Sequence, residues 1–367
     1  MKKVLFLTNY PSPYRVRFFD ELANTMDVTV LFSDRIEDKK HRSARWYIEG
    51  NQKFHVVHLS RRAAVFHSNS LCLDVTEWLK RDFDAIVVCG YANPTNMLAI
   101  CYLALHKIPF YMEVDGGLIR QEGTAQYHFK KFLVSKAACW LSTGKETTKF
   151  LAHYGAQESR VQTYPFSSLN DGDICEKIPT ADEKAELRRE LGISEEKMVL
   201  SIGQFIHRKG FDVLLQAAAS MEKSIGIYIV GGEPTAEYLQ MRENLHLPNV
   251  HFVGFQKKEE LARYYRAADA FVLPTREDIW GLVINEAMAY GLPVVTTDKC
   301  VAGMELVEDG VNGCIVPVND PAALAEKLNA VLAGDLQKMG EASLEKIRPY
   351  TIENMAKVHA EIFAKGM

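Results

Sequence analysis

Two carboxylates, Asp278 and Glu286, stand eight residues apart around a short predicted helix. Gly281 can begin this helix, Gly291 can end it and Pro293 prevents its continuation. The N–H groups and the dipole at a helix N-terminus favour a phosphate group. One acid precedes the helix and the other lies on its second turn, so both can face a ligand lying across that terminus. Acids near a helix start can also simply complement the dipole, so this prediction needs support from the rest of the chain.

A basic pair, Arg208 and Lys209, follows a predicted strand over residues 198–202. Cations beside a departing diphosphate would stabilise the charge that develops in the transition state, which raises turnover as well as binding. The alternative interpretation is a solvated surface pair. The residue types therefore allow chemistry on a diphosphate without requiring it.

The segment from Asn9 to Arg15 follows the first predicted strand and contains Pro11 and Pro13. Two fixed φ angles would present Tyr14 and Arg15 in a set direction, which suits a sugar or phosphate. The alternative is a helix-start turn with Arg15 in solvent. We name Tyr14 and Arg15 as candidate acceptor-binding residues.

Asp115, Gly116 and Gly117 follow another predicted strand, over residues 110–114. The carboxylate could accept a hydrogen bond from a sugar or acceptor hydroxyl, and the two glycines would let the backbone approach a ligand closely. Asp-Gly-Gly is also an ordinary turn sequence. We predict that Asp115 is a catalytic residue and that Gly116 and Gly117 bind the acceptor, the molecule that carries the hydroxyl.

Strands and helices that alternate along the chain would position these residues. The predicted strands span residues 4–7, 28–32, 54–59, 85–88, 110–114, 198–202, 227–230, 250–253, 270–273 and 294–296, with helices around 73–79 and 95–105. This pattern predicts the α/β class, with parallel sheets covered on both faces. Turn-forming residues over 166–184 indicate a domain boundary.

We therefore predict two Rossmann-like βαβ domains that face each other across a cleft, where ligands bind at the carboxyl ends of strands. The N-terminal domain covers residues 1–170, and the C-terminal domain covers residues 171–350. Residues 351–367 form a helix that can pack back on the N-terminal domain.

Composition argues against the disordered, collagen-like and coiled-coil classes of protein. Apolar residues make up 47% of the 367 residues and charged residues 25%, which is typical of soluble globular proteins. The net charge is −4, with +6 over residues 1–170 and −10 over the rest, and no nucleic-acid-binding motif appears, so we expect no nucleic-acid partner. Seven cysteines include no C-x-x-C pair or zinc spacing, so we predict no metal and no cofactor.

Basic and aromatic residues recur in the first half of the chain, at 39–47, at Arg61 and Arg62, and over residues 127–140. The last of these segments reads as a basic amphipathic helix. Such surfaces suit anionic headgroups, although they equally fit solvated faces over an ordinary core. No apolar stretch reaches the length of a membrane span, so we expect a cytoplasmic chain with peripheral contact to an anionic membrane.

The stretch from Asp278 to Pro293 resembles the E-x7-E region of retaining glycosyltransferases of family 4 (glycosyl transferases group 1), which have the GT-B fold. Glu286 matches that family's ribose-binding carboxylate, and Asp278 stands where its first Glu is usual. Residues 203–210 resemble the family's G-R-x4-K-G loop. Lys209 matches the family lysine, whereas Gln204 occupies the arginine position and leaves Arg208 as the candidate to restore the charge.

The resemblance implies that the N-terminal domain binds the acceptor and that the C-terminal domain binds the donor. It extends to the segments that hold the nucleotide and the reacting sugar. It implies that donor-binding residues are Gly203, Gln204, Gly254, Phe255, Trp280, Gly281, Leu282 and Val283. Asp115 takes the position where relatives often carry a His beside the anomeric carbon. The family reads the nucleobase with main-chain atoms, so the side chains cannot separate uridine from guanosine; we expect UDP rather than GDP.

The resemblance implies a retaining, metal-independent transfer of a sugar from a nucleotide-diphosphate sugar to a hydroxyl of a glycan or polyprenyl-diphosphate-linked acceptor. The expected setting is cell-surface polysaccharide biosynthesis. Two alternatives stay open: a nucleotide-sugar epimerase of similar architecture, which the Asp278–Glu286 stretch argues against, and a non-catalytic nucleotide-sugar binding protein, which Gln204 and Asp115 favour. A nicotinamide oxidoreductase is discounted because no G-x-G-x-x-G follows Leu7.

Overall fold

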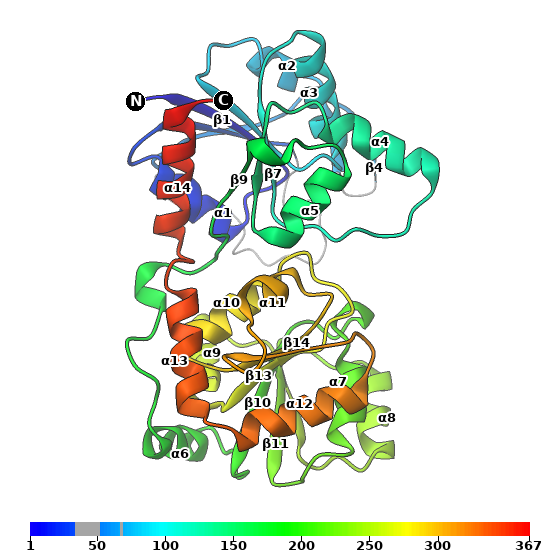
Figure 1. Cartoon of the computed structure of the whole chain (residues 1–367), viewed down its shortest axis with the longest axis vertical. Helices are drawn as coiled ribbons and strands as arrows, with labels where there is room; N and C mark the ends of the chain where they lie inside the picture. The colour runs from blue at the N-terminus through cyan, green and yellow to red at the C-terminus, as the bar shows by residue number, and fades with distance from the viewer. Residues whose placement is uncertain (34–51, 67–68) are drawn as a thin grey trace. The chain divides into compact units, whose positions relative to one another are not determined.

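The computed structural model describes residues 1–33, 52–66 and 69–367, and the basic and aromatic segment at 39–47 lies outside them. The chain divides into two compact units (Figure 1). The first unit contains Met1–Asn170 and Tyr350–Met367, and the second contains Asp171–Pro349. The chain therefore returns to the first unit for its last residues.

The first unit is built on a sheet of seven parallel strands in the order β3-β2-β1-β6-β7-β8-β9, counted over the described residues. A separate antiparallel pair is formed by β4 and β5. The strands are β1 (Lys3–Thr8), β2 (Asp27–Phe32), β3 (His55–His58), β4 (Arg62–Phe66), β5 (Asn69–Cys72), β6 (Ala85–Cys89), β7 (Tyr111–Val114), β8 (Cys139–Ser142) and β9 (Val161–Thr163). The helices are α1 (Pro13–Leu22), α2 (Val75–Trp78), α3 (Pro94–Leu105), α4 (Thr124–Val134), α5 (Lys145–His153), η3 (Glu158–Arg160) and α14 (Ile352–Lys365).

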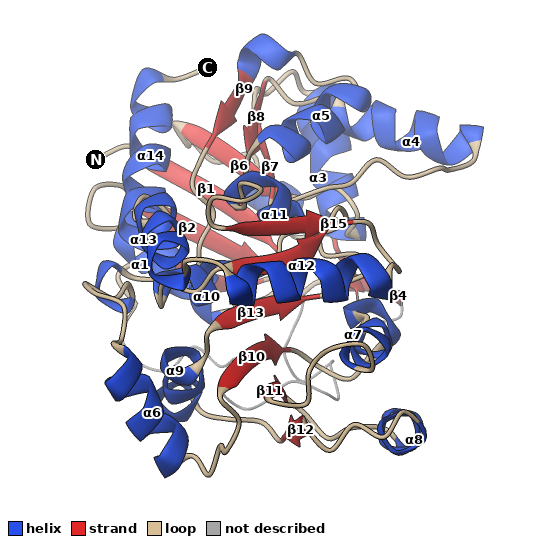
Figure 2. Ribbon diagram, turned by 60° about the horizontal axis from the view of Figure 1, so that its bottom comes forward, coloured by secondary structure: helices blue, strands red, loops and turns tan. Residues whose placement is uncertain are grey.

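The second unit has a sheet of six parallel strands in the order β12-β11-β10-β13-β14-β15 (Figure 2). The strands are β10 (Lys197–Ile202), β11 (Ile225–Val230), β12 (Val250–Val253), β13 (Ala270–Leu273), β14 (Val294–Thr297) and β15 (Gly313–Val316). The helices are η4 (Asp171–Asp173), α6 (Ala181–Glu190), η5 (His207–Lys209), α7 (Phe211–Ala218), α8 (Ala236–Asn244), α9 (Lys258–Ala267), α10 (Leu282–Ala289), α11 (Val301–Leu306), α12 (Pro321–Ala333) and α13 (Leu336–Ile347).

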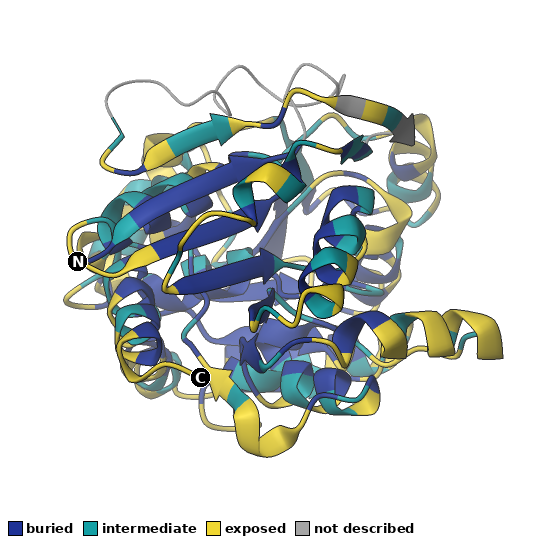
Figure 3. Cartoon of the chain, turned by 90° about the horizontal axis from the view of Figure 1, so that it is seen from above, coloured by how far each residue is buried: buried dark blue, intermediate teal, exposed yellow. Residues whose placement is uncertain are grey.

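The central strands are largely apolar because helices cover both faces of each sheet, and Figure 3 shows the buried strands of the first unit in dark blue. In β1, Leu5 and Leu7 contribute to one core cluster. Phe6 points the other way, since successive side chains alternate across a strand, and its ring lies 5.0 Å from that of Phe19 and 6.0 Å from that of Phe363. Helix α14 thus completes an aromatic layer that α1 begins, and the two helices run side by side in Figure 1.

Local sequence signals set several helix starts. Asn93 caps α3 by accepting a hydrogen bond from the N–H of Thr95, and Pro94 takes the first helical position. Asp320 caps α12 in the same way. The predicted helix over residues 127–140 is wrong in its second half, because α4 ends at Val134 and Trp140 belongs to the buried strand β8.

The predicted α/β class with two Rossmann-like domains is confirmed, whereas the predicted cleft stays a prediction. In each sheet the strand order reverses at one point, between β1 and β6 in the first unit and between β10 and β13 in the second. Ligands of such sheets bind beyond the carboxyl ends of the strands at this switch point. Among the described residues, no helix has the length and hydropathy that a bilayer-spanning segment requires.

Candidate functional site

Two cations and a carboxylate meet at the switch point of the second unit. Lys209 Nζ lies 2.8 Å from Asp278 Oδ2, and Arg208 Nη1 lies 3.2 Å from the same oxygen. The side chains of Lys209 and Asp278 are 13% and 12% exposed, whereas that of Arg208 is 47% exposed. The three groups carry a net charge of +1, so the cluster can accept an anionic ligand while Asp278 keeps the two cations together.

The loop that carries the two cations owes its shape to Gly210, which has a φ of 69°. A side chain at Gly210 would place its Cβ 2.0 Å from the carbonyl oxygen of Pro274, so this position requires glycine. The hydroxyl of Thr275 donates to the carbonyl oxygen of Arg208 at 2.9 Å. The loops after β10 and β13 are therefore fastened to each other, which brings residues about 70 positions apart to one place.

Helix α10 begins beside this cluster, with Gly281 at its N-cap in the left-handed region (φ 102°) and no side-chain cap. Leu282 and Val283 form its first turn. The preceding residue, Trp280, is buried, and its indole N–H donates to Asn285 Oδ1 at 2.9 Å, which fixes the entry to the helix. An N-terminus without a capping side chain presents backbone N–H groups toward a ligand such as phosphate.

Glu286 lies on the second turn of α10 and is half-buried. The hydroxyl of Tyr265 donates to its Oε2 at 2.9 Å, and the Tyr265 ring stacks on that of Tyr290 at 5.0 Å. Burial raises the pKa of Tyr265 well above its ordinary value, and the neighbouring Glu286 charge adds to the rise. Tyr265 therefore stays a hydrogen-bond donor and holds one oxygen of Glu286 in place.

The remaining predicted donor-binding residues lie at the same edge of the sheet. Gly203 and Gln204 follow β10, and Gly254 and Phe255 follow β12. Gly203 packs closely on Gly231, where a Cβ would lie 2.6 Å from the carbonyl oxygen of Gly203. The Phe255 side chain is 69% exposed and Gln204 is also exposed. These positions offer backbone and one exposed ring to a ligand.

The first unit has a charged cluster of a different kind. Arg15 Nη1 donates to both oxygens of Glu113, at 3.0 and 2.9 Å, and its Nη2 donates to Asp115 Oδ1 at 2.5 Å. Arg15 is 4% exposed and Glu113 is 1% exposed. Arg15 thus faces inward, is engaged by two carboxylates and holds Asp115 in place.

Burial and pairing act in opposite directions on these ionisable groups. Burial raises the pKa of Asp115 above its ordinary value, and the Arg15 charge only partly offsets that effect. Burial also acts to raise the pKa of Glu113, but there the Arg15 guanidinium and the contacts with His359 and Cys89 together outweigh burial, and the pKa lies well below its usual range. Glu113 is therefore the permanent partner of Arg15, and Asp115 is the carboxyl that can exchange a proton.

Three further predicted residues surround Asp115. The Tyr14 ring packs edge-on against Phe166 with centroids 5.6 Å apart, and burial raises the pKa of Tyr14. Gly116 has a φ of 145°, and a Cβ at Gly117 would meet the Phe150 ring at 2.6 Å. The backbone after β7 therefore turns sharply and leaves Asp115 at the carboxyl end of its strand.

Sequence reasoning did not single out Glu113, Tyr164, His359 or Tyr265 as partners of the candidate residues. A signal existed for Glu113, because a charged residue inside the apolar strand β7 needs a partner of opposite charge. His359 reaches this cluster from α14, and nothing near it in the sequence indicates that contact.

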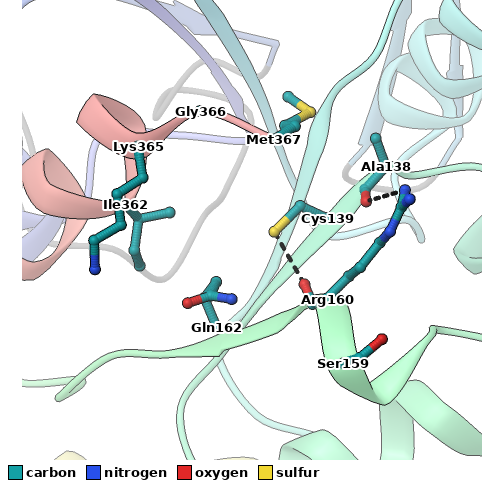
Figure 4. A pocket seen from close by; sticks show the side chains of 9 residues that line it. All are labelled: Ala138, Cys139, Ser159, Arg160, Gln162, Ile362, Lys365, Gly366 and Met367. Carbon is teal, nitrogen blue, oxygen red and sulfur yellow. Dashed lines mark hydrogen bonds between the residues drawn. The ribbon is translucent and has the colours of Figure 1, made fainter.

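A cavity of about 280 Å³ lies elsewhere in the first unit, between Cys139, Arg160, Gln162 and the end of α14 (Figure 4). It adjoins the amino ends of β8 and β9, opposite to the edge where ligands of such sheets bind. Among the described residues, no group of three or more His, Cys, Asp or Glu side chains could hold a metal ion.

The chain has the GT-B fold of glycosyltransferases, as solved structures show along its whole length. It resembles Anabaena HepE in complex with UDP with a TM-score of 0.77, 17% identity and full coverage of both chains. It also resembles sucrose-phosphate synthase from Thermosynechococcus elongatus with a TM-score of 0.75 and 19% identity, covering 100% of this chain and 99% of that one.

Residues 183–348 match the family model described as Glycosyl transferases group 1. A D-inositol 3-phosphate glycosyltransferase from Streptomyces bingchenggensis is 29% identical over 245 residues, which cover 62% of this chain and 52% of the relative. The chain spans about half the length of this relative and of three further D-inositol 3-phosphate glycosyltransferases. The segment that matches the family model lies within the second unit.

Proposed function

We propose that this protein is a retaining glycosyltransferase that needs no metal ion and moves a sugar from a nucleotide-diphosphate sugar to a hydroxyl group. The observation that carries the proposal is the cluster of Arg208, Lys209 and Asp278 beside the uncapped start of α10. This cluster lies at the switch point of the sheet and within the matched segment 183–348. Cations and a helix N-terminus together suit a diphosphate.

In this proposal the second unit binds the donor. Lys209, Arg208 and the first N–H groups of α10 hold the diphosphate, and Glu286 holds the ribose. Asp278 exchanges part of its contact with the cations for a hydroxyl of the donor sugar. When the bond from the anomeric carbon to the diphosphate breaks, the cations neutralise the charge on the leaving oxygen. The leaving diphosphate accepts the proton of the acceptor hydroxyl, whose oxygen bonds to the same face of the sugar.

The first unit binds the acceptor in this proposal, and Asp115 orients a hydroxyl of the acceptor or the donor sugar. We propose UDP as the nucleotide; the Anabaena HepE structures contain UDP and, in one case, UDP-glucose. We propose as acceptor a glycan or polyprenyl-diphosphate-linked glycan in cell-surface polysaccharide biosynthesis, on the cytoplasmic side of the membrane.

The test is turnover of UDP-sugars in the presence of EDTA, followed by proton NMR at the anomeric position. Retention predicts that an α-linked donor gives an α-linked product. Lys209→Ala should lower turnover by about 10² to 10³-fold, the usual effect of removing one group that stabilises transition-state charge. The control is Lys223→Ala, which removes the same charge from the loop before β11, at the amino end of the strands.

Four outcomes would contradict this proposal. A β-linked product would exclude retention, and full dependence on a divalent metal would exclude the metal-free reaction. Equal turnover of the Lys209 and Lys223 variants would show that the donor site does not lie at Lys209. Conversion of the UDP-sugar to its epimer without an acceptor would instead support the epimerase.

We also propose that α4 is the site of peripheral contact with an anionic membrane. Phe129 and Phe132 on this helix are 50% and 47% exposed, and α4 is mostly exposed in Figure 3. Lys136 Nζ lies 4.7 Å from the centre of the Phe132 ring, and Lys131 Nζ lies 5.6 Å from that of Tyr127. Exposed rings with lysines and no acidic residue on the helix suit anionic headgroups.

Sedimentation with phosphatidylglycerol vesicles, compared with phosphatidylcholine vesicles, tests this contact. The double variant Phe129→Ser, Phe132→Ser should lose binding to the anionic vesicles. Leu239→Ser is the control, since Leu239 is a comparably exposed apolar residue on α8 of the second unit. Equal binding of both variants, or no preference for anionic vesicles, would contradict the proposal.

A further inference from the structure

The charged cluster of the first unit includes a residue from the other end of the chain, His359 on α14. Its ring is fully buried, with its centroid 4.5 Å from that of Tyr164 and 4.8 Å from that of Phe18. Nε2 lies 3.4 Å from Glu113 Oε1, within ion-pair distance, and makes no hydrogen bond to the described residues. Helix α14 thus directs a polar ring atom at the carboxylate that binds Arg15.

The other ring nitrogen shows how the hydrogens are placed. Nδ1 lies 2.8 Å from the backbone carbonyl oxygen of Met355, which can only accept a hydrogen bond. Nδ1 must therefore carry a hydrogen. A neutral ring would then turn the lone pair of Nε2 toward the negative Glu113, whereas a ring with hydrogens on both nitrogens attracts it.

When Asp115 is ionised, the charge balance of the cluster also favours a His359 ring with hydrogens on both nitrogens. Arg15 with Glu113 and Asp115 carries a net charge of −1 in a region where Arg15 and Glu113 are almost completely buried. A positive His359 brings the sum to zero, and an uncompensated buried charge is costly. The cysteine thiol of Cys89, which donates to Glu113 Oε2 at 3.1 Å, adds a hydrogen bond without adding charge.

The contacts of Asp115 show how the charged cluster holds this side chain. Its Oδ1 accepts hydrogen bonds from Arg15 at 2.5 Å and from Tyr164 at 3.2 Å. No hydrogen bond to Oδ2 is formed within the described residues, and the Asp115 side chain is 29% exposed. One oxygen is therefore anchored while the other is available to a hydroxyl of a ligand.

We propose that His359 is a positioning residue for Asp115: as a cation on the C-terminal helix it holds Glu113, which holds Arg15, which fixes Asp115 Oδ1 and leaves Oδ2 for a substrate hydroxyl. This inference rests on the proposed function, because it assigns Asp115 to the acceptor or sugar hydroxyl. It adds that the last helix of the chain tunes the site rather than only covering the sheet.

The charge on His359 affects how activity depends on pH. The groups that face Asp115 and His359 are Arg15 and Tyr14 from α1, Glu113 from β7, Cys89 at the end of β6 and Tyr164 after β9. Without the positive ring, the negative charge of Glu113 acts more strongly on Asp115, whose pKa burial has already raised. Loss of the ring charge must therefore move the acidic limb of activity to higher pH.

The experiment compares His359→Gln and His359→Leu with the wild type in kcat and KM for sugar transfer between pH 5 and 9. At metal sites, removing a group that orients a ligand side chain typically lowers activity or metal affinity by about 10- to 100-fold. We expect kcat to fall about tenfold here, with KM changed little. The acidic limb should move upward in both variants. Glutamine can restore a hydrogen bond to Glu113 but no charge, so it should recover folding without recovering the pH profile.

Phe363→Leu is the matched control, because Phe363 is also buried on α14 and its ring packs on Phe6 and Tyr111 and edge-on against His359 without carrying a polar atom or a charge. It should lower stability and leave the acidic limb in place. An unchanged limb and kcat in folded His359→Gln, or the same shift in Phe363→Leu, would overturn the proposal.

A readout that needs no activity separates this inference from the proposed function. Nitrogen-15 NMR of histidine-labelled wild type at pH 7.5, assigned by difference from His359→Gln, should show hydrogens on both ring nitrogens of His359. A neutral ring would overturn the inference even if the protein transfers sugars. A doubly protonated ring in a protein that turns over no donor would instead contradict the proposed function while leaving the charge network standing.

Discussion

The two units share one plan of parallel strands and covering helices, yet they treat charge in opposite ways at their switch points. In the first unit, Arg15 and Glu113 are 4% and 1% exposed and their partners are all fixed side chains. In the second unit, Lys209 and Arg208 share Asp278, and the Arg208 side chain is 47% exposed. The first cluster is sealed except at Asp115, whose side chain is 29% exposed, and the second is partly open at Arg208.

This difference corresponds to two kinds of task. A sealed network holds a carboxyl group in one position because every charge is already compensated by the protein. Cations that share one carboxylate at a partly open site can exchange it for an incoming phosphate. The comparison therefore predicts that loss of Arg15 from the first cluster mainly lowers stability, whereas substitutions in the second cluster mainly change ligand binding and turnover.

The largest expected effect is on stability, from Arg15→Met. Removing one partner of a buried ion pair leaves Glu113 and Asp115 uncompensated and costs about 3–5 kcal/mol in free energy of unfolding. Urea unfolding measures this cost. Arg208→Met removes the same group from the open cluster and should cost about 1 kcal/mol or less. Equal losses in the two variants would show that the clusters do not differ as described.

The second prediction concerns Asp278→Asn in the open cluster. Without this carboxylate, Lys209 and Arg208 keep their charge but lose their shared partner, so UDP should bind more tightly by up to about tenfold, or 1.4 kcal/mol. Turnover should fall by about 10² to 10³-fold, since a contact to the reacting sugar is lost. Calorimetry and steady-state kinetics give the two values. Weaker UDP binding together with unchanged turnover would exclude the assigned role of Asp278.

The third and smallest effect is a pH dependence of stability in the sealed cluster. Burial raises the pKa of Asp115 in the folded protein, so its ionised form lowers stability at pH values above that pKa, and this loss disappears as the pH falls. Asp115→Asn removes the ionisation, so the stability of the variant relative to wild type should increase as the pH rises toward the pKa of Asp115. Urea unfolding between pH 5 and 8 measures it. Asp82→Asn, at an exposed site of the first unit, is the control, and a difference independent of pH would contradict the prediction.

The sequence predicted the class of fold because the apolar strands and the turn residues between them are local signals. The apolar composition of strands such as residues 4–7 and 198–202 indicates that these strands are buried. Candidate residues of the second unit also come from local patterns, chiefly the helix between Gly281 and Gly291 and the loop at residues 203–210, although their roles stay predictions. Local reasoning works where neighbouring residues decide the structure.

The charged network of the first unit could not be predicted in this way. Arg15, Glu113 and His359 lie on three elements separated by about 100 and about 250 positions, and only the folded unit brings them together. The presence of Glu113 in an apolar strand indicates that some cation must pair with it, but not which one. Arg15 was accordingly predicted to face a ligand, whereas it faces two carboxylates.

Binding of UDP to the second unit's cluster in the presence of EDTA tests the central claim most directly. Isothermal calorimetry on the wild type and on Lys209→Ala compares the two affinities, with Lys223→Ala as the control. The account predicts metal-free binding that weakens about 10 to 100-fold in Lys209→Ala, as expected for loss of one charged hydrogen bond, and stays unchanged in the control. No binding of UDP, GDP or ADP to the wild type, or equal affinity in the two lysine variants, would contradict it.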